Sequence, residues 1–265
     1  MGERNASQEF LDSHQYSDHS ISRYEKIFGR TYVSTGGEGT TKGLTKKMNL
    51  KPGQRVLDVG CGTGGSAFYL AKTYGVQVLG LDLSRNMINK AKQYQGELDE
   101  ETKKLIEFQV ADVLKVSLPE ESFDAVYSRD AILHIGNKEE LFANLFKWVR
   151  PGGQLLITDY ARGQDKCGEE FEDYVAGRGY RLLTVPKYGK LLEDAGWKQV
   201  QAIDNTEEFV STMKRELDLL NSIKESFISE FSQKDFNDLE NGWTKKLNWV
   251  DRNEHVWGLY MAKKF

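Results

Sequence analysis

The sequence predicts an α/β fold in which a mostly parallel sheet carries helices on both faces. Short apolar runs alternate with segments of helical periodicity between residues 51 and 160, an order typical of parallel strands joined by crossover helices. The first of these runs leads directly into a glycine-rich loop. Two further apolar runs after residue 195 bring the expected number of strands to seven.

Each element is expected from a local pattern. Apolar runs of strand length predict strands at 55–59, 76–81, 106–110, 123–127, 154–159, 199–203 and 255–263. Helical spacing predicts helices at 21–28, 66–74, 138–149 and 185–195, and one that begins after Ser84 as its N-cap. Apolar residues three and four apart from Phe209 to Phe231 predict one long amphipathic helix that packs on the core. Residues 150–153 predict a turn, and residues 161–181, rich in glycine and charge, predict a lid or insertion.

The composition excludes several classes of protein. The net charge is −4 over 265 residues, so nothing indicates a chain that neutralises a nucleic acid backbone. The two cysteines, Cys61 and Cys167, lack metal-ligand spacing, so we expect neither a disulfide framework nor a metal site. The polar N-terminus does not resemble a signal peptide, and no apolar run approaches the ~20 residues that span a bilayer. We therefore expect a cytoplasmic monomer without nucleic acid partners or membrane insertion.

The most distinctive local motif follows the first strand and reads Asp58-Val59-Gly60-Cys61-Gly62-Thr63-Gly64. Glycine lacks a Cβ, so this backbone can turn tightly and approach a nucleotide closely. The acid at Asp58 distinguishes the loop from those that bind a pyrophosphate, which require free N–H groups and no carboxylate nearby. An acid here suits a cationic ligand instead. The motif resembles the glycine loop of class I S-adenosylmethionine-dependent methyltransferases, in which Asp58, Gly60, Gly62 and Gly64 would contact the cofactor.

Two more acids follow the next two strands. Asp82, followed by Leu83, lies 22 positions after Gly60, where a carboxylate can accept hydrogen bonds from ribose hydroxyls. Asp112, followed by Val113, ends the third strand, where an acid can accept from the adenine amino group. Either acid alone could equally be a turn or helix cap. Three acids at three successive strand ends favour the cofactor interpretation.

A more specific resemblance extends over nearly the whole chain. It is carried by the motifs Gln15-Tyr16-Ser17-Asp18, Tyr32-Val33-Ser34-Thr35-Gly36-Gly37, Ser128-Arg129-Asp130-Ala131-Ile132-Leu133-His134, Ile157-Thr158-Asp159-Tyr160, Arg178-Gly179-Tyr180 and Gly242-Trp243-Thr244-Lys245-Lys246. These motifs resemble the phosphoethanolamine N-methyltransferase family. The resemblance implies S-adenosylmethionine-dependent N-methylation of phosphoethanolamine or its mono- and dimethyl forms towards phosphocholine, for phosphatidylcholine synthesis, with S-adenosylhomocysteine as the second product.

The resemblance also implies an organisation for the chain, whose length resembles the compact members of the family. We expect one Rossmann-like class I methyltransferase domain over residues 1–265, with an N-terminal helical cap at 1–50 and a cofactor-binding core at 51–160. A lid with substrate-binding elements is expected at 161–250, and a closing strand at 251–265.

The amine end of such a substrate needs an unprotonated nitrogen aligned with the methyl group. His134 is the candidate base, because the unperturbed pKa of histidine is ~6.5. A lone histidine is more often structural, but its place after the fourth strand favours a catalytic role. The resemblance pairs His134 with Tyr16 and assigns Asp130 to the substrate amine. It also implies cofactor contacts from Gln15, Tyr16, Val33, Ser34 and Arg129.

The other end of the substrate is a phosphate monoester, which calls for cationic and hydroxyl donors. The resemblance implies substrate contacts from Gln15, Tyr16, Asp130, Tyr160, Tyr174, Arg178, Tyr180 and Lys246. Without it, Lys246 would be interpreted as a solvated surface charge.

Two other functions remain open from the sequence. One is a methyltransferase for another small amine, such as glycine, sarcosine or dimethylglycine, whose carboxylate a single arginine could bind. The other is a module that binds S-adenosylmethionine without turnover.

Overall fold

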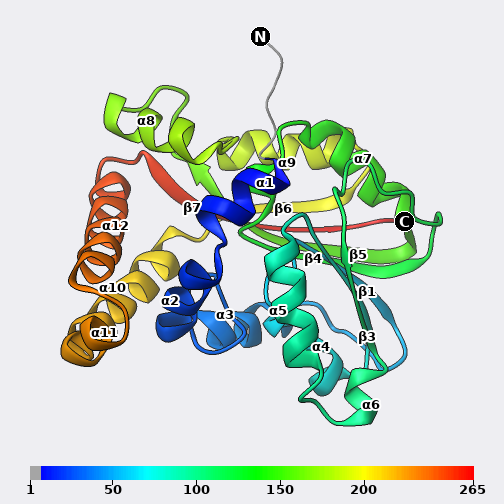
Figure 1. The fold of residues 1–265 in the computed structure, drawn as a ribbon. Helices are drawn as coiled ribbons and strands as arrows, with labels where there is room; N and C mark the ends of the chain where they lie inside the picture. Colours follow the sequence, from blue (N-terminus) through cyan, green and yellow to red (C-terminus); the bar gives the residue numbers. More distant parts are fainter. Residues whose placement is uncertain (1–6) are drawn as a thin grey trace.

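The computed structural model describes residues 7–265 and contains a seven-stranded sheet covered by helices on both faces (Figure 1). The strand order is β3-β2-β1-β4-β5-β7-β6. Strands β1 to β5 are parallel, whereas β7 is antiparallel to both of its neighbours. The predicted mostly parallel α/β sheet is confirmed. The strands are β1 Arg55–Val59, β2 Gln77–Asp82, β3 Ile106–Val110, β4 Phe123–Arg129, β5 Val149–Arg162, β6 Lys198–Asp204 and β7 His255–Lys263.

The helices begin and end close to the expected positions. Ser84 caps the helix that follows β2, because its hydroxyl oxygen accepts the Met87 backbone N–H at 3.2 Å, as predicted. The helical elements are α1 Gln8–Phe10, η1 Leu11–Gln15, α2 Asp18–Phe28, α3 Gly37–Thr45, α4 Gly65–Tyr74, α5 Arg85–Gln95, α6 Glu100–Lys103, η2 Ile132–His134, α7 Lys138–Trp148, α8 Glu169–Arg178, α9 Val185–Asp194, α10 Thr206–Ser222, α11 Lys224–Glu230 and α12 Gln233–Asp251.

The two faces of the sheet bury separate apolar clusters. In β1, Leu57 packs with α7 and α9 on one face, whereas Val56 packs with α4 and α5 on the other. This alternation follows from the period of two along a strand. Because both faces are covered, the central strands are mainly apolar.

A third apolar cluster lies beyond the carboxyl ends of the strands. It joins α2 and α8 to the long helices α10 and α12, and it includes Phe171, Phe209, Phe236 and Trp243. Figure 1 shows these helices grouped on one side of the sheet. The predicted N-terminal cap and the predicted lid therefore pack together above the strand ends. No helix within residues 7–265 is both long and apolar enough to cross a membrane.

Two sequence predictions are wrong in detail. Residues 150–153 lie inside β5 and not in a turn, because Gly152 and Gly153 exchange backbone hydrogen bonds with Lys264. The helix expected from Phe209 to Phe231 is interrupted at Ile223, which separates α10 from α11. Periodicity missed this break because Ile223 still packs against the third cluster.

Helices α8 and α12 are among those that were not expected as such. The predicted lid at 161–181 contains α8, and its first two residues still belong to β5. The long helix α12 runs from the predicted region 161–250 into the first residue of the predicted closing strand, and it was not predicted as an element. The predicted division of one domain into cap, core, lid and closing strand stays a prediction.

Candidate active site

The site lies where the strand order changes direction. The glycine turn leaves β1, the string from Asp130 to His134 leaves the adjacent β4, and ligands bind at such a switch point in open parallel sheets. Gly60 has a φ of +73°, and a Cβ there would lie 2.1 Å from the Ala131 Cβ. Only glycine permits the two segments to approach so closely.

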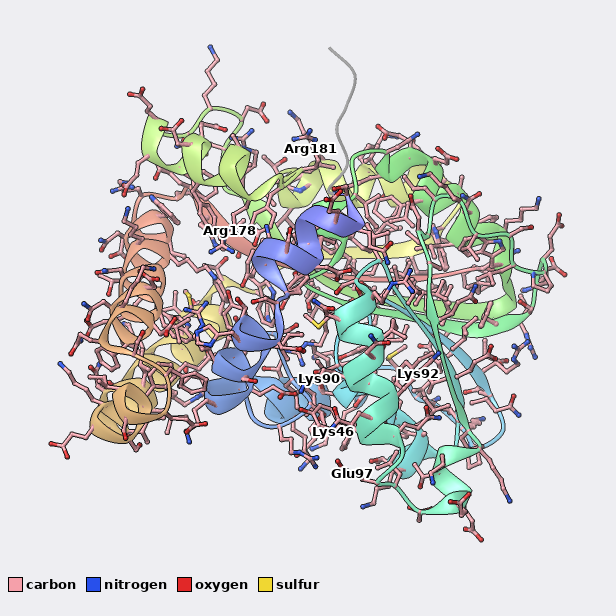
Figure 2. The ribbon with its side chains drawn as sticks, viewed as in Figure 1. Lys46, Lys90, Lys92, Glu97, Arg178 and Arg181 are labelled. Carbon is pink, nitrogen blue, oxygen red and sulfur yellow. The ribbon has the colours of Figure 1, made fainter. Side chains whose placement is uncertain are left out.

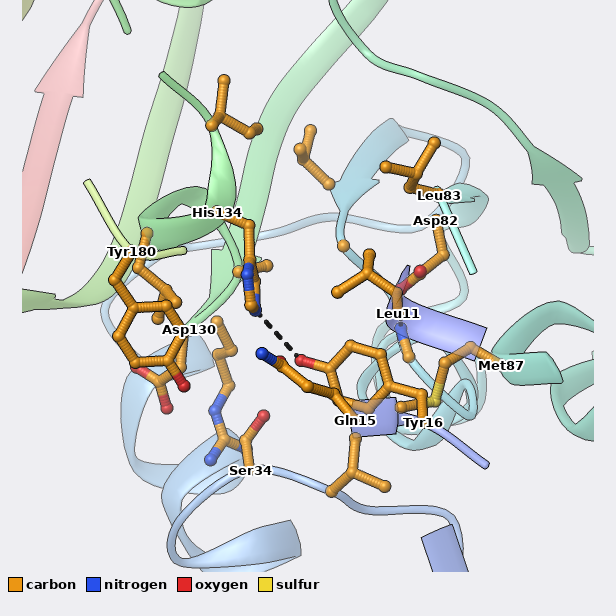
Figure 3. Close-up of a pocket in the computed structure, with 18 of the residues that line it drawn as sticks. Leu11, Gln15, Tyr16, Ser34, Asp82, Leu83, Met87, Asp130, His134 and Tyr180 are labelled. Atoms are coloured by element: carbon orange, nitrogen blue, oxygen red, sulfur yellow. Dashed lines mark hydrogen bonds between the residues drawn. The ribbon is translucent and has the colours of Figure 1, made fainter. Parts of the chain in front are cut away.

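One large cavity extends across these strand ends and under the N-terminal segment. In Figure 3, Asp82, Leu83 and Met87 line one side of it and His134 and Tyr180 the other. Almost every predicted site residue lines this cavity. They are Gln15, Tyr16, Val33, Ser34, Gly60, Gly62, Asp82, Leu83, Asp112, Val113, Arg129, Asp130, His134, Tyr160, Tyr174, Arg178, Tyr180 and Lys246.

Asp58 and Gly64 do not line the large cavity. Asp58 lines a smaller adjoining one, and its buried Oδ2 has no hydrogen-bond partner among the described residues. Burial first, and then the negative charge of Asp82, raise the pKa of Asp58 to about 7. Gly64 has a φ of +91° and precedes α4, where a Cβ would lie 2.7 Å from the Phe68 ring. Glycine at position 64 is therefore required by the conformation of the turn.

Asp82 and Asp112 both accept backbone hydrogen bonds. The two carboxylate oxygens of Asp82 accept the N–H of Gly62 at 2.9 Å and of Ser84 at 2.8 Å. Burial raises the pKa of Asp82 to about 6. Asp112 accepts the N–H of Leu114 at 3.0 Å. Each acid thus also has the capping role that the sequence left open, while lining the cavity.

Tyr16 and His134 meet across the cavity. The Tyr16 hydroxyl lies 3.1 Å from His134 Nε2, as the dashed line in Figure 3 marks. His134 Nδ1 is buried without a partner among the described residues. Burial, and then the positive charges of Lys138 and Arg178, lower the pKa of His134 to about 3. His134 is therefore a neutral imidazole at physiological pH, whose unprotonated ring nitrogen can accept a hydrogen bond.

Asp130 is held in an unusual backbone conformation directly after β4, with a φ of +50°. Its Oδ1 accepts hydrogen bonds from Trp257 Nε1 at 2.7 Å and from the Thr158 hydroxyl at 3.1 Å. Its Oδ2 is buried without a partner among the described residues. Burial raises the pKa of Asp130. One carboxylate oxygen is thus fixed, and the other is left for a donor inside the cavity.

Arg129 is buried and holds the segment that contains Val33 and Ser34. Its guanidinium donates to the carbonyls of Thr35 and Gly37 at 2.5 and 2.9 Å and to the Thr41 hydroxyl at 2.7 Å. The last residue of β4 therefore fixes the loop that covers one side of the cavity. This contact through the protein backbone was not foreseen for Arg129.

Cationic and phenolic side chains also gather around the cavity. Lys246 on α12 donates to the Tyr160 hydroxyl at 3.3 Å, and its Nζ lies 5.0 Å from the centre of that ring. The Arg178 guanidinium lies 5.9 Å from the Tyr174 ring centre, and the Tyr180 ring meets His134 edge-on at 5.1 Å. Half-buried Lys246 is thus not a freely solvated surface charge.

Side chains of the N-terminal segment close the cavity from one side. Gln15 Nε2 donates to the Arg178 carbonyl at 3.1 Å, and Figure 2 shows Arg178 beside the N-terminal helices. Tyr24 on α2 also lines the cavity, although the sequence indicated only its helical spacing. Trp257 was missed as well, because only the pairing of β7 with β5 brings it beside Asp130.

The chain is similar to known methyltransferases along most of its length. A methyltransferase-domain family model matches residues 57–157, which run from β1 into β5. The chain is 49% identical to phosphoethanolamine N-methyltransferase 1 of Zea mays over 97% of this chain and 50% of that protein. It is 37% identical to the phosphoethanolamine N-methyltransferase of Plasmodium falciparum over 98% of this chain and 97% of that protein.

The chain belongs to the phosphoethanolamine N-methyltransferase family. The predicted family is therefore confirmed. A solved structure of the family, phosphoethanolamine N-methyltransferase 2 of Haemonchus contortus in complex with phosphomonomethylethanolamine and S-adenosylhomocysteine, matches with a TM-score of 0.93. The two chains are 33% identical, and the match covers 97% of this chain and 59% of the Haemonchus contortus chain. The chain spans about half the length of the plant members it matches.

Proposed function

We propose that this chain transfers methyl groups from S-adenosylmethionine to the nitrogen of phosphoethanolamine or of its methylated forms, towards phosphocholine. The observation that supports it is one cavity lined by two chemically different sets of side chains. Asp130, His134 and Tyr16 line it together with the glycine turn, and Arg178 and Lys246 line it among tyrosines. A small ligand with an amine and a phosphate would suit these two sets.

The residues around the glycine turn suit S-adenosylmethionine. When bound, this cofactor supplies a methyl group on a positively charged sulfur. Asp82 and Asp112 line the cavity as acceptors for ribose and adenine donors. The unpartnered, buried Oδ2 of Asp58 in the adjoining cavity suits a cationic amino group. No group of three or more potential metal ligands occurs within residues 7–265.

Three side chains of this protein have separate roles towards the substrate amine. Asp130 offers its free Oδ2 to an N–H of the substrate and orients the nitrogen. In the tautomer with unprotonated Nε2, His134 accepts a hydrogen bond from the Tyr16 hydroxyl. The Tyr16 oxygen then keeps lone pairs that can accept an N–H of the substrate and orient its nitrogen.

Towards the substrate phosphate, Arg178 and Lys246 supply positive charge and the tyrosine hydroxyls supply further donors. Substrates with a carboxylate, such as glycine or sarcosine, would leave part of this set unused. Buried donors without partners are costly, so the geometry favours a phosphate monoester over the carboxylate alternatives. The hydrogen-bonded pair of Tyr16 and His134, which lines the same cavity as Asp130, favours an enzyme over a module that only binds the cofactor.

The experiment is direct. The purified chain is mixed with S-adenosylmethionine and, separately, with phosphoethanolamine and its mono- and dimethyl forms, and the products are identified by mass spectrometry. We expect a mass gain of one or more methyl groups from at least one phosphobase. Methylation of glycine or sarcosine only, or inhibition by betaine but not by phosphocholine, would favour the carboxylate alternative. Binding without turnover would favour the module.

We also propose that the chain works in the cytoplasm as a monomer, without nucleic acid partners. Both cysteines are free in the structure, which suits a reducing compartment. Gel filtration with light scattering tests the oligomeric state, and microscopy of a tagged protein tests the compartment.

A further inference from the structure

The short helix η2 carries His134 into the cavity, and groups outside it hold most of its backbone. The turn has few hydrogen bonds of its own, since His134 N donates to Ala131 O at 3.2 Å and Ile135 N to Ile132 O at 2.9 Å. A turn of three residues is not rigid by itself. Its position therefore depends on what binds its remaining N–H and C=O groups.

Lys138, at the start of α7, binds two of these groups. Its Nζ donates to the Ile132 carbonyl at 2.6 Å and to the Ile135 carbonyl at 2.9 Å, the residues on both sides of the Leu133–His134 pair. The side chain is only 2% exposed. Burying an ammonium group is costly, and on most helices a lysine would point to solvent instead.

Asp159 on β5 binds the same turn from the sheet side. Its Oδ1 accepts the Leu133 N–H at 3.1 Å, and the residue is fully buried. The Leu133 carbonyl in turn accepts the N–H of Arg181, which follows the lid helix α8, at 2.7 Å. The turn with His134 is thus fastened to α7, to β5 and to the lid.

We infer that Lys138 and Asp159 are positioning residues for the methyl transfer, which hold the η2 turn so that His134 meets the Tyr16 hydroxyl. The inference rests on the proposed function for its kinetic consequence. Neither residue lines the cavity, so neither would touch a substrate. Two ionisable side chains buried beside this turn are otherwise unexplained by packing, because burying such polar groups is costly unless they are hydrogen-bonded.

A purely structural role predicts a different result from a positioning role. Lys138→Met leaves two buried carbonyls without a donor and Asp159 without a nearby cation, so it would lower the melting temperature in either case. The double variant Lys138→Met/Asp159→Asn removes both ionisable groups, while the Asn side chain can still accept from Leu133. We expect the double variant to recover much of the melting temperature but not the turnover.

The test compares wild type, Lys138→Met, the double variant and a control, Lys147→Met. Lys147 lies on the same helix, is exposed and pairs with Glu120. All are assayed well below their melting temperatures. We expect kcat to fall tenfold or more in the first two variants, with S-adenosylmethionine affinity within about twofold of wild type and the control unchanged. A double variant with restored stability and wild-type kcat would overturn the inference.

A second readout does not need turnover, so that the inference and the proposed function can fail separately. The imidazole NMR signals of His134 can be assigned with a His134→Gln variant, because the chain has four histidines. Around this ring stand Tyr16, Tyr180, Arg178 and Lys138. We expect the His134 signals to move or broaden in the double variant. Unchanged signals would refute the positioning role, even if wild type methylates nothing.

Discussion

At the scale of single residues, the sequence predicted which side chains gather in the cavity better than it predicted what each one touches. Asp82, Asp130 and His134 could be named because acids and histidines at strand ends are few and their chemistry is specific. The hydrogen-bond partners of these residues could not be named, because Trp257 reaches Asp130 only through the pairing of β7 with β5. Such contacts depend on strand order, which no local pattern encodes.

Asp82 provides the first prediction at this scale. Asp82→Ala should weaken S-adenosylmethionine binding by roughly tenfold to a hundredfold, because hydrogen bonds to a charged group contribute ~1.5–3 kcal/mol. Isothermal titration calorimetry measures the affinity. The control is Asp165→Ala, which removes an exposed carboxylate paired with Lys187 and should leave binding unchanged. Equal affinities in wild type and Asp82→Ala would exclude a role in cofactor binding.

Lys246 provides the second prediction, with the adjacent Lys245 as a matched control. Lys246→Met removes an ammonium group from the cavity and should raise the KM for the phosphobase at least tenfold, while cofactor affinity stays the same. Lys245 is exposed and pairs with Glu170, so Lys245→Met should behave as wild type. Steady-state kinetics on both variants measures the KM for the phosphobase. A wild-type KM for Lys246→Met would contradict its role in binding the phosphate.

At the scale of elements, the strands were predicted most closely and the helices after β6 least. Strands buried on both faces are continuous apolar runs with glycines or acids at their ends, which a sequence displays directly. The break at Ile223 and the helix α12 depend on packing in the third cluster. That packing joins residues far apart in the chain, so periodicity gave one long helix where the structure has two.

The N-terminal segment and α5 give a prediction at this scale. Asn86 Nδ2 donates to the carbonyls of Asp12 and Tyr16 at 3.1 and 2.9 Å, and the Asp12 carboxylate accepts from the Ser84 hydroxyl at 2.5 Å. The segment with Tyr16 is therefore docked on the first turn of α5, where a carboxylate is favourable.

Asn86→Ala should loosen this docking, because two hydrogen bonds of ~1 kcal/mol each are lost. We expect faster proteolytic cleavage within the first 20 residues and a kcat lower by about tenfold. The control Asn221→Ala removes an exposed side-chain bond to the Leu217 carbonyl on α10. Unchanged proteolysis and kcat in Asn86→Ala would indicate that other contacts hold the segment.

At the scale of the whole molecule, one buried acid connects two separate elements beside the cavity. Glu216 on α10 accepts the Gly36 N–H at 2.6 Å and Trp243 Nε1, on α12, at 3.1 Å. Burial raises the pKa of Glu216 to about 7, although both hydrogen bonds oppose the rise. The loop beside Ser34 and the helix that carries Lys246 thus share one carboxylate.

Glu216 predicts a pH dependence of stability. A carboxyl whose pKa is higher in the folded than in the unfolded protein stabilises the fold fully below the unfolded pKa, near 4.3. This contribution is lost as the pH rises through about 7. Because Glu216→Gln stays neutral, the free energy of unfolding of wild type should fall relative to the variant by about 3 kcal/mol between pH 4.5 and 8. Denaturant unfolding at several pH values measures this, and a constant difference would contradict it.

The left-handed backbone at Asp130 limits how its chemistry can be probed. At a φ of +50°, asparagine and aspartate are tolerated far better than alanine. Replacement by alanine would therefore mix the loss of a carboxylate with a distorted main chain beside the glycine turn, whereas Asp130→Asn keeps the shape and changes only the charge. The same restriction bears on evolution, since few residue types at this position could change the preferred amine without also disturbing the neighbouring cofactor loop.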